Sequence, residues 1–111
     1  MVNITSTTEN DILKITVDGE VDASSSIELD NAIKGAIESS KKIMVDLSKL
    51  AYISSAGLCV FVSHLEDIKE DMQLVLFGLS ESVMQVFELL GLQELLTIEA
   101  DENAAVQRLN G

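Results

Sequence analysis

The residues best suited to chemistry in this chain are two adjacent hydroxyls, Ser54 and Ser55, in the stretch YISSAGL. They follow an apolar run and precede apolar residues at helical spacing, so they mark the start of a predicted helix. A serine at this place can cap the helix, act as a nucleophile, or accept a phosphoryl group from another protein. One serine is enough for a cap, so the second hydroxyl needs a separate explanation.

A hydrolase nucleophile is the poorest of these interpretations. The elbow motif G-x-S-x-G needs glycine two residues before the serine, and Ile53 stands there relative to Ser55. His64, the only histidine, follows nine residues later on the same predicted helix. That spacing turns it about half a turn away from Ser55 and about 13 Å along the axis. We therefore expect no catalytic residue and no enzymatic activity, and we expect His64 to be a surface or boundary residue.

The start of a helix also favours an anion, either bound or covalently attached. A bound phosphate usually brings a glycine-rich loop and a basic residue. Here SSAG holds one glycine, and no Lys or Arg follows until Lys69. A covalent phosphate needs only an exposed hydroxyl and a partner kinase, so it fits better than a small nucleotide-binding protein, which is the weaker alternative.

Composition limits the partners of the chain. Its 111 residues are 47% apolar, which predicts one folded domain, 1–111. The net charge of −12 argues against nucleic acid and against an anionic membrane surface, and it favours a basic protein partner or simply solubility. Cys59 is the only cysteine, so no intramolecular disulfide is expected, and we expect it to be a small buried residue. No signal peptide or membrane span is apparent, which predicts a cytoplasmic protein. We also expect no metal and no cofactor.

The elements that must position the serines alternate between strand and helix periods, which predicts an α/β fold with a partly parallel sheet. Ser25 and Glu28 are spaced as a capping box, Ser80 and Asp101 are predicted helix starts, and Gly91 is a predicted stop. Strand patterns lie at 3–8, 11–20, 42–48, 72–78 and 95–100, and helical patterns lie at 25–37, 58–68, 80–90 and 101–109.

Several stretches together resemble a known family. VDLSKLAYISSAGLCVFV resembles the signature of anti-sigma factor antagonists, the stand-alone STAS domains. VDGEVDASSSIELDNAI, MQLVLFGLSESVMQVFELLGLQELLTI and ADENAAVQRL resemble the family's turn and first helix, its later strand and helix, and its last helix. The resemblance covers roughly 9–109. It implies a single STAS-like domain with a mixed sheet of about five strands and about four helices packed mainly on one face.

The resemblance also implies a modification site. The family pattern D-S-[ST/A]-G-L, aligned on Gly57-Leu58, puts Ser55 on the phosphorylated serine and Ala56 on the variable position. Ser54 stands where Asp is common, which is a departure that can alter recognition and makes Ser54 a secondary candidate. Asp22 matches an acidic residue near the site, and it can also cap the helix that follows it. The implied partner-binding residues are Asp22, Ser54, Ser55, Ala56 and Gly57.

The function that the resemblance implies is partner switching. The unmodified protein binds an anti-sigma factor, which is a serine kinase with a histidine-kinase-type ATPase fold. Phosphorylation of Ser55 separates the two proteins, and a metal-dependent serine phosphatase restores the active form. The alternative is a STAS scaffold or transporter-associated subunit in which the site is never modified.

Overall fold

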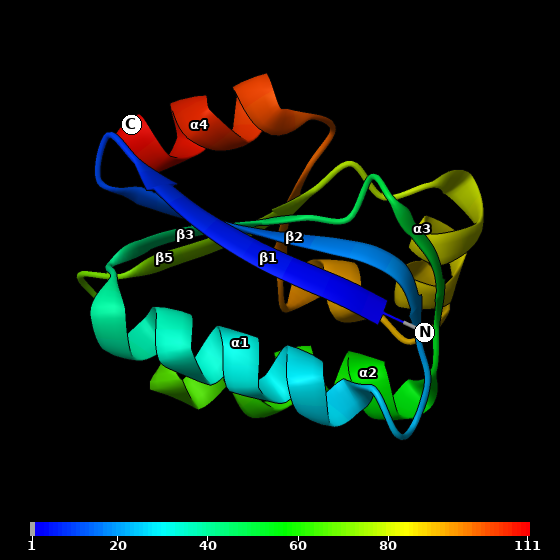
Figure 1. Ribbon diagram of the computed structural model, residues 1–111. Coiled ribbons are helices and arrows are strands. Elements are labelled where there is room, and N and C mark those ends of the chain that lie inside the picture. The colour runs from blue at the N-terminus through cyan, green and yellow to red at the C-terminus, as the bar shows by residue number, and fades with distance from the viewer. Residues whose placement is uncertain (1) are drawn as a thin grey trace.

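A six-stranded mixed sheet forms the centre of the computed structural model (Figure 1). The structure describes residues 2–111, and Met1, the first residue of the polar N-terminal stretch, lies outside them. The elements are β1 (Val2–Glu9), β2 (Ile12–Val21), α1 (Ser26–Ser39), β3 (Lys42–Asp46), β4 (Leu50–Ile53), α2 (Ser55–Ser63), the 3-10 turn η1 (Leu65–Asp67), β5 (Gln73–Phe77), α3 (Glu81–Leu89), the 3-10 turn η2 (Leu92–Glu94), β6 (Thr97–Glu99) and α4 (Glu102–Asn110).

The strands follow the order β1-β2-β3-β5-β6, and β4 pairs with β2 beyond the end of β3. Among the strand pairs of residues 2–111, only β1–β2 is antiparallel. Its two-residue turn, Asn10-Asp11, has φ angles of 54° and 67°, which short polar side chains tolerate and tight hairpins require. The other strand pairs are parallel, and helices lie between their strands in the chain, as the alternating sequence pattern predicts.

Helices cover both faces of the sheet unequally. Residues of α1, α2 and α3 share one large core with β2, β3 and β5, in which the rings of Phe61 and Phe87 lie 6.2 Å apart. In Figure 1, α4 lies on the opposite side of the sheet from α1 and α2. There it closes a smaller core made of Ile12, Met44, Val75, Phe77, Ala105 and Leu109. The expected α/β fold with helices mainly on one face is therefore confirmed.

Several local predictions hold at the helix ends. Ser80 Oγ accepts a hydrogen bond from the Val83 N–H at 3.3 Å, and Asp101 Oδ1 accepts one from the Ala104 N–H at 2.9 Å. Gly91 has a φ of 72° directly after α3, which is the left-handed conformation that ends a helix. Helix α2 ends at Ser63, earlier than the apolar spacing predicts, and a short 3-10 turn takes over.

The expected mixed sheet of about five strands is confirmed, and the structure has six. The sequence patterns do not indicate the additional strand, β4, which has only four residues and pairs with β2 after a register shift between Gly19 and Glu20. Cys59 is exposed instead of buried, because it occupies a position of α2 that faces away from the core formed by Leu58 and Phe61.

Candidate functional site

The predicted site lies where the parallel strands β2 and β4 end side by side. Val21, the last residue of β2, pairs with Ile53, the last residue of β4. The Ser54 N–H donates to the Val21 carbonyl oxygen at 2.8 Å, so the chain leaving β4 is fixed to the chain leaving β2. Asp22 and Ser54, each the first residue after its strand, are therefore neighbours.

The two serines have different roles. Ser54 has an extended backbone, with φ −81° and ψ 170°, and its Oγ accepts a hydrogen bond from the Gly57 N–H at 3.3 Å. Ser54 is thus the cap of α2, and it is half-buried. Ser55 is the first helical residue and is exposed, and its hydroxyl makes no hydrogen bond to any residue in 2–111. The second hydroxyl is free to be modified without loss of the cap.

Gly57 lets the start of α2 approach the two strands. A Cβ atom at this position would lie 2.7 Å from Ile53 Cγ1 and 2.8 Å from Val21 Cγ1, closer than real Cβ atoms come. Gly57 is itself buried, and Ala56 is half-buried. Close packing thus explains the glycine. Gly57 positions Ser55 by letting α2 approach the strands, and as a buried residue it adds no exposed surface for a partner.

Asp22 caps the turn that leads into α1. Its Oδ1 accepts hydrogen bonds from the Ser25 N–H and the Ser24 hydroxyl at 2.8 Å each, and from the Ser25 hydroxyl at 2.9 Å. In return the Asp22 N–H donates to Ser25 Oγ at 2.8 Å. The expected capping box at Ser25 and Glu28 is therefore wrong: Ser25 makes no side-chain cap, and the reciprocal pair is Asp22 with Ser25.

These hydrogen bonds fix the charge of Asp22. The Ser25 backbone N–H, followed by the Ser24 and Ser25 hydroxyls, lowers the pKa of the Asp22 carboxyl from 3.8 to about 2. The side chain is consequently ionised at neutral pH. All three donors reach Oδ1, and Oδ2 has no hydrogen-bond partner within residues 2–111, so it can accept a donor from a bound protein.

Exposed apolar side chains accompany this polar edge. Tyr52 on β4 pairs with Glu20 on β2 and is 51% exposed, although it lies only three residues before Ser55. Ile27, in the first turn of α1, is 64% exposed. An exposed hydroxyl, a fixed carboxylate and large apolar groups form a surface that suits protein docking.

His64 is more deeply buried than the expected surface or boundary residue. It is 8% exposed, and its Nε2 lies 2.7 Å from Asp30 Oδ1 while its Nδ1 lies 3.0 Å from Asp67 Oδ2. It directly follows α2, at the opposite end from Ser55, and links that end to α1. The sequence gives no signal for this contact, because Asp30 and His64 are 34 residues apart.

Asp46 closes the end of β3. Its Oδ1 accepts hydrogen bonds from the Ser48 N–H at 2.9 Å and from the Ser48 hydroxyl at 2.6 Å.

Within the described chain, no three His, Cys, Asp or Glu side chains are grouped so that they could hold a metal ion. None of the helices in residues 2–111 has the length and apolar character needed to cross a membrane.

Comparison with known proteins identifies the fold and the family of the chain. The STAS domain family model matches residues 3–105. An anti-sigma-B factor antagonist of Listeria monocytogenes is 31% identical over 93 residues, which is 82% of each chain. A crystal structure of an anti-sigma factor antagonist from Mycobacterium paratuberculosis superposes with a TM-score of 0.93 at 17% identity, covering 100% of this chain and 96% of that one. The Bacillus cell fate determinant SpoIIAA in its phosphorylated form superposes with a TM-score of 0.69 at 19% identity, covering 97% and 98%. The fold, the family match over most of the sequence and the similarity to an anti-sigma-B factor antagonist agree, and the chain belongs to the STAS domain family.

Proposed function

We propose that this protein is an anti-sigma factor antagonist that works by partner switching and catalyses no reaction. With Ser55 unmodified it binds an anti-sigma factor, a serine kinase with a histidine-kinase-type ATPase fold, in the cytoplasm. The observation that carries the proposal is the free, exposed hydroxyl of Ser55 at the first turn of α2, next to a serine that already supplies the cap. The similarity to anti-sigma-B factor antagonists supports the same role.

The proposed switch transfers the γ-phosphoryl group of ATP to Ser55 Oγ. The bond between the γ-phosphorus and the bridging oxygen breaks, ADP leaves, and a base of the kinase takes the hydroxyl proton. The phosphate adds about −1.5 to −2 charges at pH 7. At the start of a helix such an anion is stabilised by roughly 0.3–1 kcal/mol, so the fold is retained. A metal-dependent serine phosphatase then hydrolyses the phosphoester and restores the hydroxyl.

Release of the partner follows from electrostatics at the docking surface. A new dianion at Ser55 follows Ser54, whose N–H is bonded to the residue before the ionised Asp22, and it must lose water on docking. Each 1.4 kcal/mol or so of added cost weakens binding about tenfold. A cost of two such increments weakens binding about a hundredfold, which is enough to separate the proteins. In the unmodified state, Tyr52 provides apolar contact and Asp22 Oδ2 accepts a hydrogen bond.

Ser54 is the secondary candidate for modification. Its hydroxyl accepts the Gly57 N–H and is half-buried, so a phosphate there would replace the cap. We therefore expect Ser55 to be modified first, even though the family's usual Asp is absent beside it.

The test is to incubate the protein with ATP and a serine kinase of the histidine-kinase-type ATPase fold from the same organism, and to measure the intact mass. One added phosphoryl group is expected on the natural chain and on Ser54→Ala, and none on Ser55→Ala. Absence of modification in the natural chain, or modification that persists in Ser55→Ala, would contradict the switch and favour a scaffold role.

A further inference from the structure

Helix α3 carries more apolar surface than the core covers. Its apolar stripe includes Val83, Val86, Phe87 and Leu90, but only Val83 and Phe87 are buried. Val86 is 36% exposed, and Leu90, the residue directly after α3, is 56% exposed. The stripe therefore continues from the core out onto the surface.

Further exposed leucines extend this stripe. Leu89, at the end of α3, is 84% exposed, and Leu95, directly after η2, is 58% exposed. The turn at Gly91 folds η2 back against α3, so these residues belong to one corner of the fold. We call Leu89, Leu90 and Leu95 the leucine surface.

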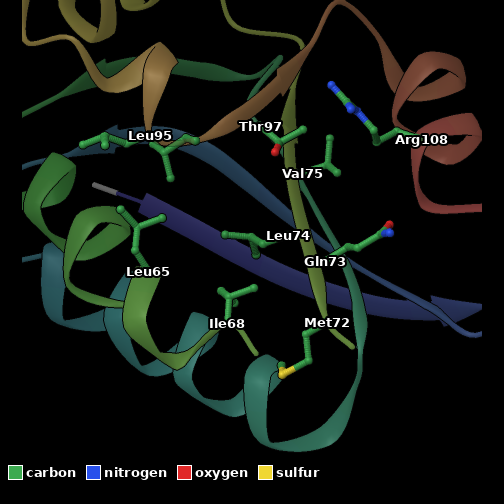
Figure 2. A pocket seen from close by; sticks show the side chains of 10 residues that line it. Leu65, Ile68, Met72, Gln73, Leu74, Val75, Leu95, Thr97 and Arg108 are labelled. Carbon is green, nitrogen blue, oxygen red and sulfur yellow. The ribbon is translucent and has the colours of Figure 1, made fainter. Parts of the chain in front are cut away.

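The leucine surface adjoins a groove of about 320 Å³ that both apolar and polar side chains line (Figure 2). Leu95 belongs to both. Leu65, Ile68 and Leu74 lie around the same end of the groove, whereas Gln73 and Arg108 lie at the other end in Figure 2. The groove exists because β6 pairs with β5 only from Val75 onward, which leaves the first residues of β5 uncovered on that side.

The charges around this corner have one sign. Every charged residue between Gln73 and Gln107 is acidic, and Glu88 and Glu94, on α3 and η2, are both exposed. The next base, Arg108, is already paired with Glu99, with 2.9 Å between Nε and Oε2. The leucine surface, which Glu88 and Glu94 border, is complementary to an apolar surface bordered by Lys and Arg.

This charge pattern also decides between possible occupants. A second copy of the chain would bring two acidic borders together, each on a protein of net charge −12. An anionic membrane surface would repel the same border. We propose that the leucine surface and its groove dock a partner protein through a segment whose apolar side chains are flanked by Lys or Arg. This docking is independent of the modification of Ser55.

The proposal can be tested with a defined probe. The probe is an amphipathic peptide of about 14 residues with Leu on one helical face and Lys on the other, long enough to form a marginal helix. Its control has the same length and charge, with Ser in place of Leu. Each is titrated into the isotope-labelled protein, and backbone amide shifts are measured by NMR. We expect the Leu–Lys peptide to shift amides of residues 86–97 and to bind at least about tenfold more tightly than the Ser–Lys peptide, because apolar anchors carry most of such affinity.

Variants make the assignment specific. Leu89→Ser, Leu90→Ser and Leu95→Ser, combined, should abolish the advantage of the Leu–Lys peptide, while the matched double variant Gln85→Ser, Gln93→Ser should retain it. Leu89→Ser alone serves if the triple variant unfolds, since this side chain is almost fully exposed. Ser55→Ala should bind the peptide as the natural chain does, so failure here is distinguishable from failure of the proposed switch.

Three results would overturn the inference. Equal binding of both peptides would show charge attraction without an apolar site. Shifts centred on Asp22 and Ser55, or unchanged binding by the triple variant, would place docking elsewhere. Concentration-dependent dimers in sedimentation that the triple variant abolishes would show that a second copy covers the surface.

Discussion

The close approach of Gly57 to the strands gives a sharp test of how the site is held. An added Cβ at Gly57 meets Ile53 Cγ1 at 2.7 Å and Val21 Cγ1 at 2.8 Å. Both neighbours are β-branched, buried and stiff in χ1, so neither can easily move aside. Overpacking of this kind costs about 1–3 kcal/mol, whereas replacing glycine by alanine in a helix gains about 1 kcal/mol. We expect Gly57→Ala to lower the free energy of unfolding by about 1 kcal/mol, with a range of roughly 0–2.

The chain contains its own control for the helix term. Gly35 lies inside α1, and nothing lies within 4 Å of a Cβ built on it. Gly35→Ala should therefore raise the free energy of unfolding by about 0.5–1 kcal/mol. The difference between the two variants isolates the packing cost, because both gain the same helix propensity.

Urea unfolding followed by circular dichroism measures both changes. Gly57→Ala and Gly35→Ala should shift the midpoint in opposite directions with similar slopes, because neither alters the surface exposed on unfolding. If Gly57→Ala stabilised the protein as much as Gly35→Ala, the glycine would not be required for packing. The explanation given for the position of Ser55 would then be wrong.

Three further predictions follow from the site and its surroundings. Ser54→Ala should cost about 1 kcal/mol of stability by removing the cap, whereas Ser55→Asp should change stability by less than about 0.5 kcal/mol and yet weaken kinase binding at least about tenfold in calorimetry. The pKa of Asp22 is lowered first by the Ser25 N–H, so the ionised carboxylate gives stability that is fully present above pH 3.8 and is lost as the pH falls through about 2. The difference in free energy of unfolding between the natural chain and Asp22→Ala should therefore shrink over that range. A difference that stays constant would contradict the ionised cap. His64→Ala should lower the free energy of unfolding by about 1–2 kcal/mol, seen as a lower melting temperature. The rate of Ser55 phosphorylation should stay unchanged, because the ring contacts the far end of α2.

The sequence predicts the layered fold because its strand and helix periods are strong and its caps are local. Ser80, Asp101 and Gly91 act within three or four residues of themselves, so their roles can be seen in the spacing. The short strand β4 could not be predicted this way. Four residues carry too little periodicity, and this strand forms only because β2 changes register at Gly19 and continues beyond β3.

Parts of the site depend on contacts that sequence spacing cannot encode. The assignment of Ser54 as cap and Ser55 as free hydroxyl needs the backbone angles of both residues. The Asp22–Ser25 pair replaces the expected Ser25–Glu28 pair because the chain begins to turn three residues earlier than the apolar stripe indicates. The exposure of Cys59 depends on how α2 is rotated about its axis.

The separate small core beneath α4 has a consequence for the dynamics of the molecule. This helix buries Ala105 and Leu109, and its links to the sheet side are exposed ion pairs, Lys14 with Glu102 and Arg108 with Glu99. Such pairs contribute little in water, so α4 can detach while the larger core stays closed. The C-terminal helix is then the first unit to open in native-state hydrogen exchange. Its amides should lose protection at a free energy well below that of β2 and β3, which open only when the whole domain unfolds.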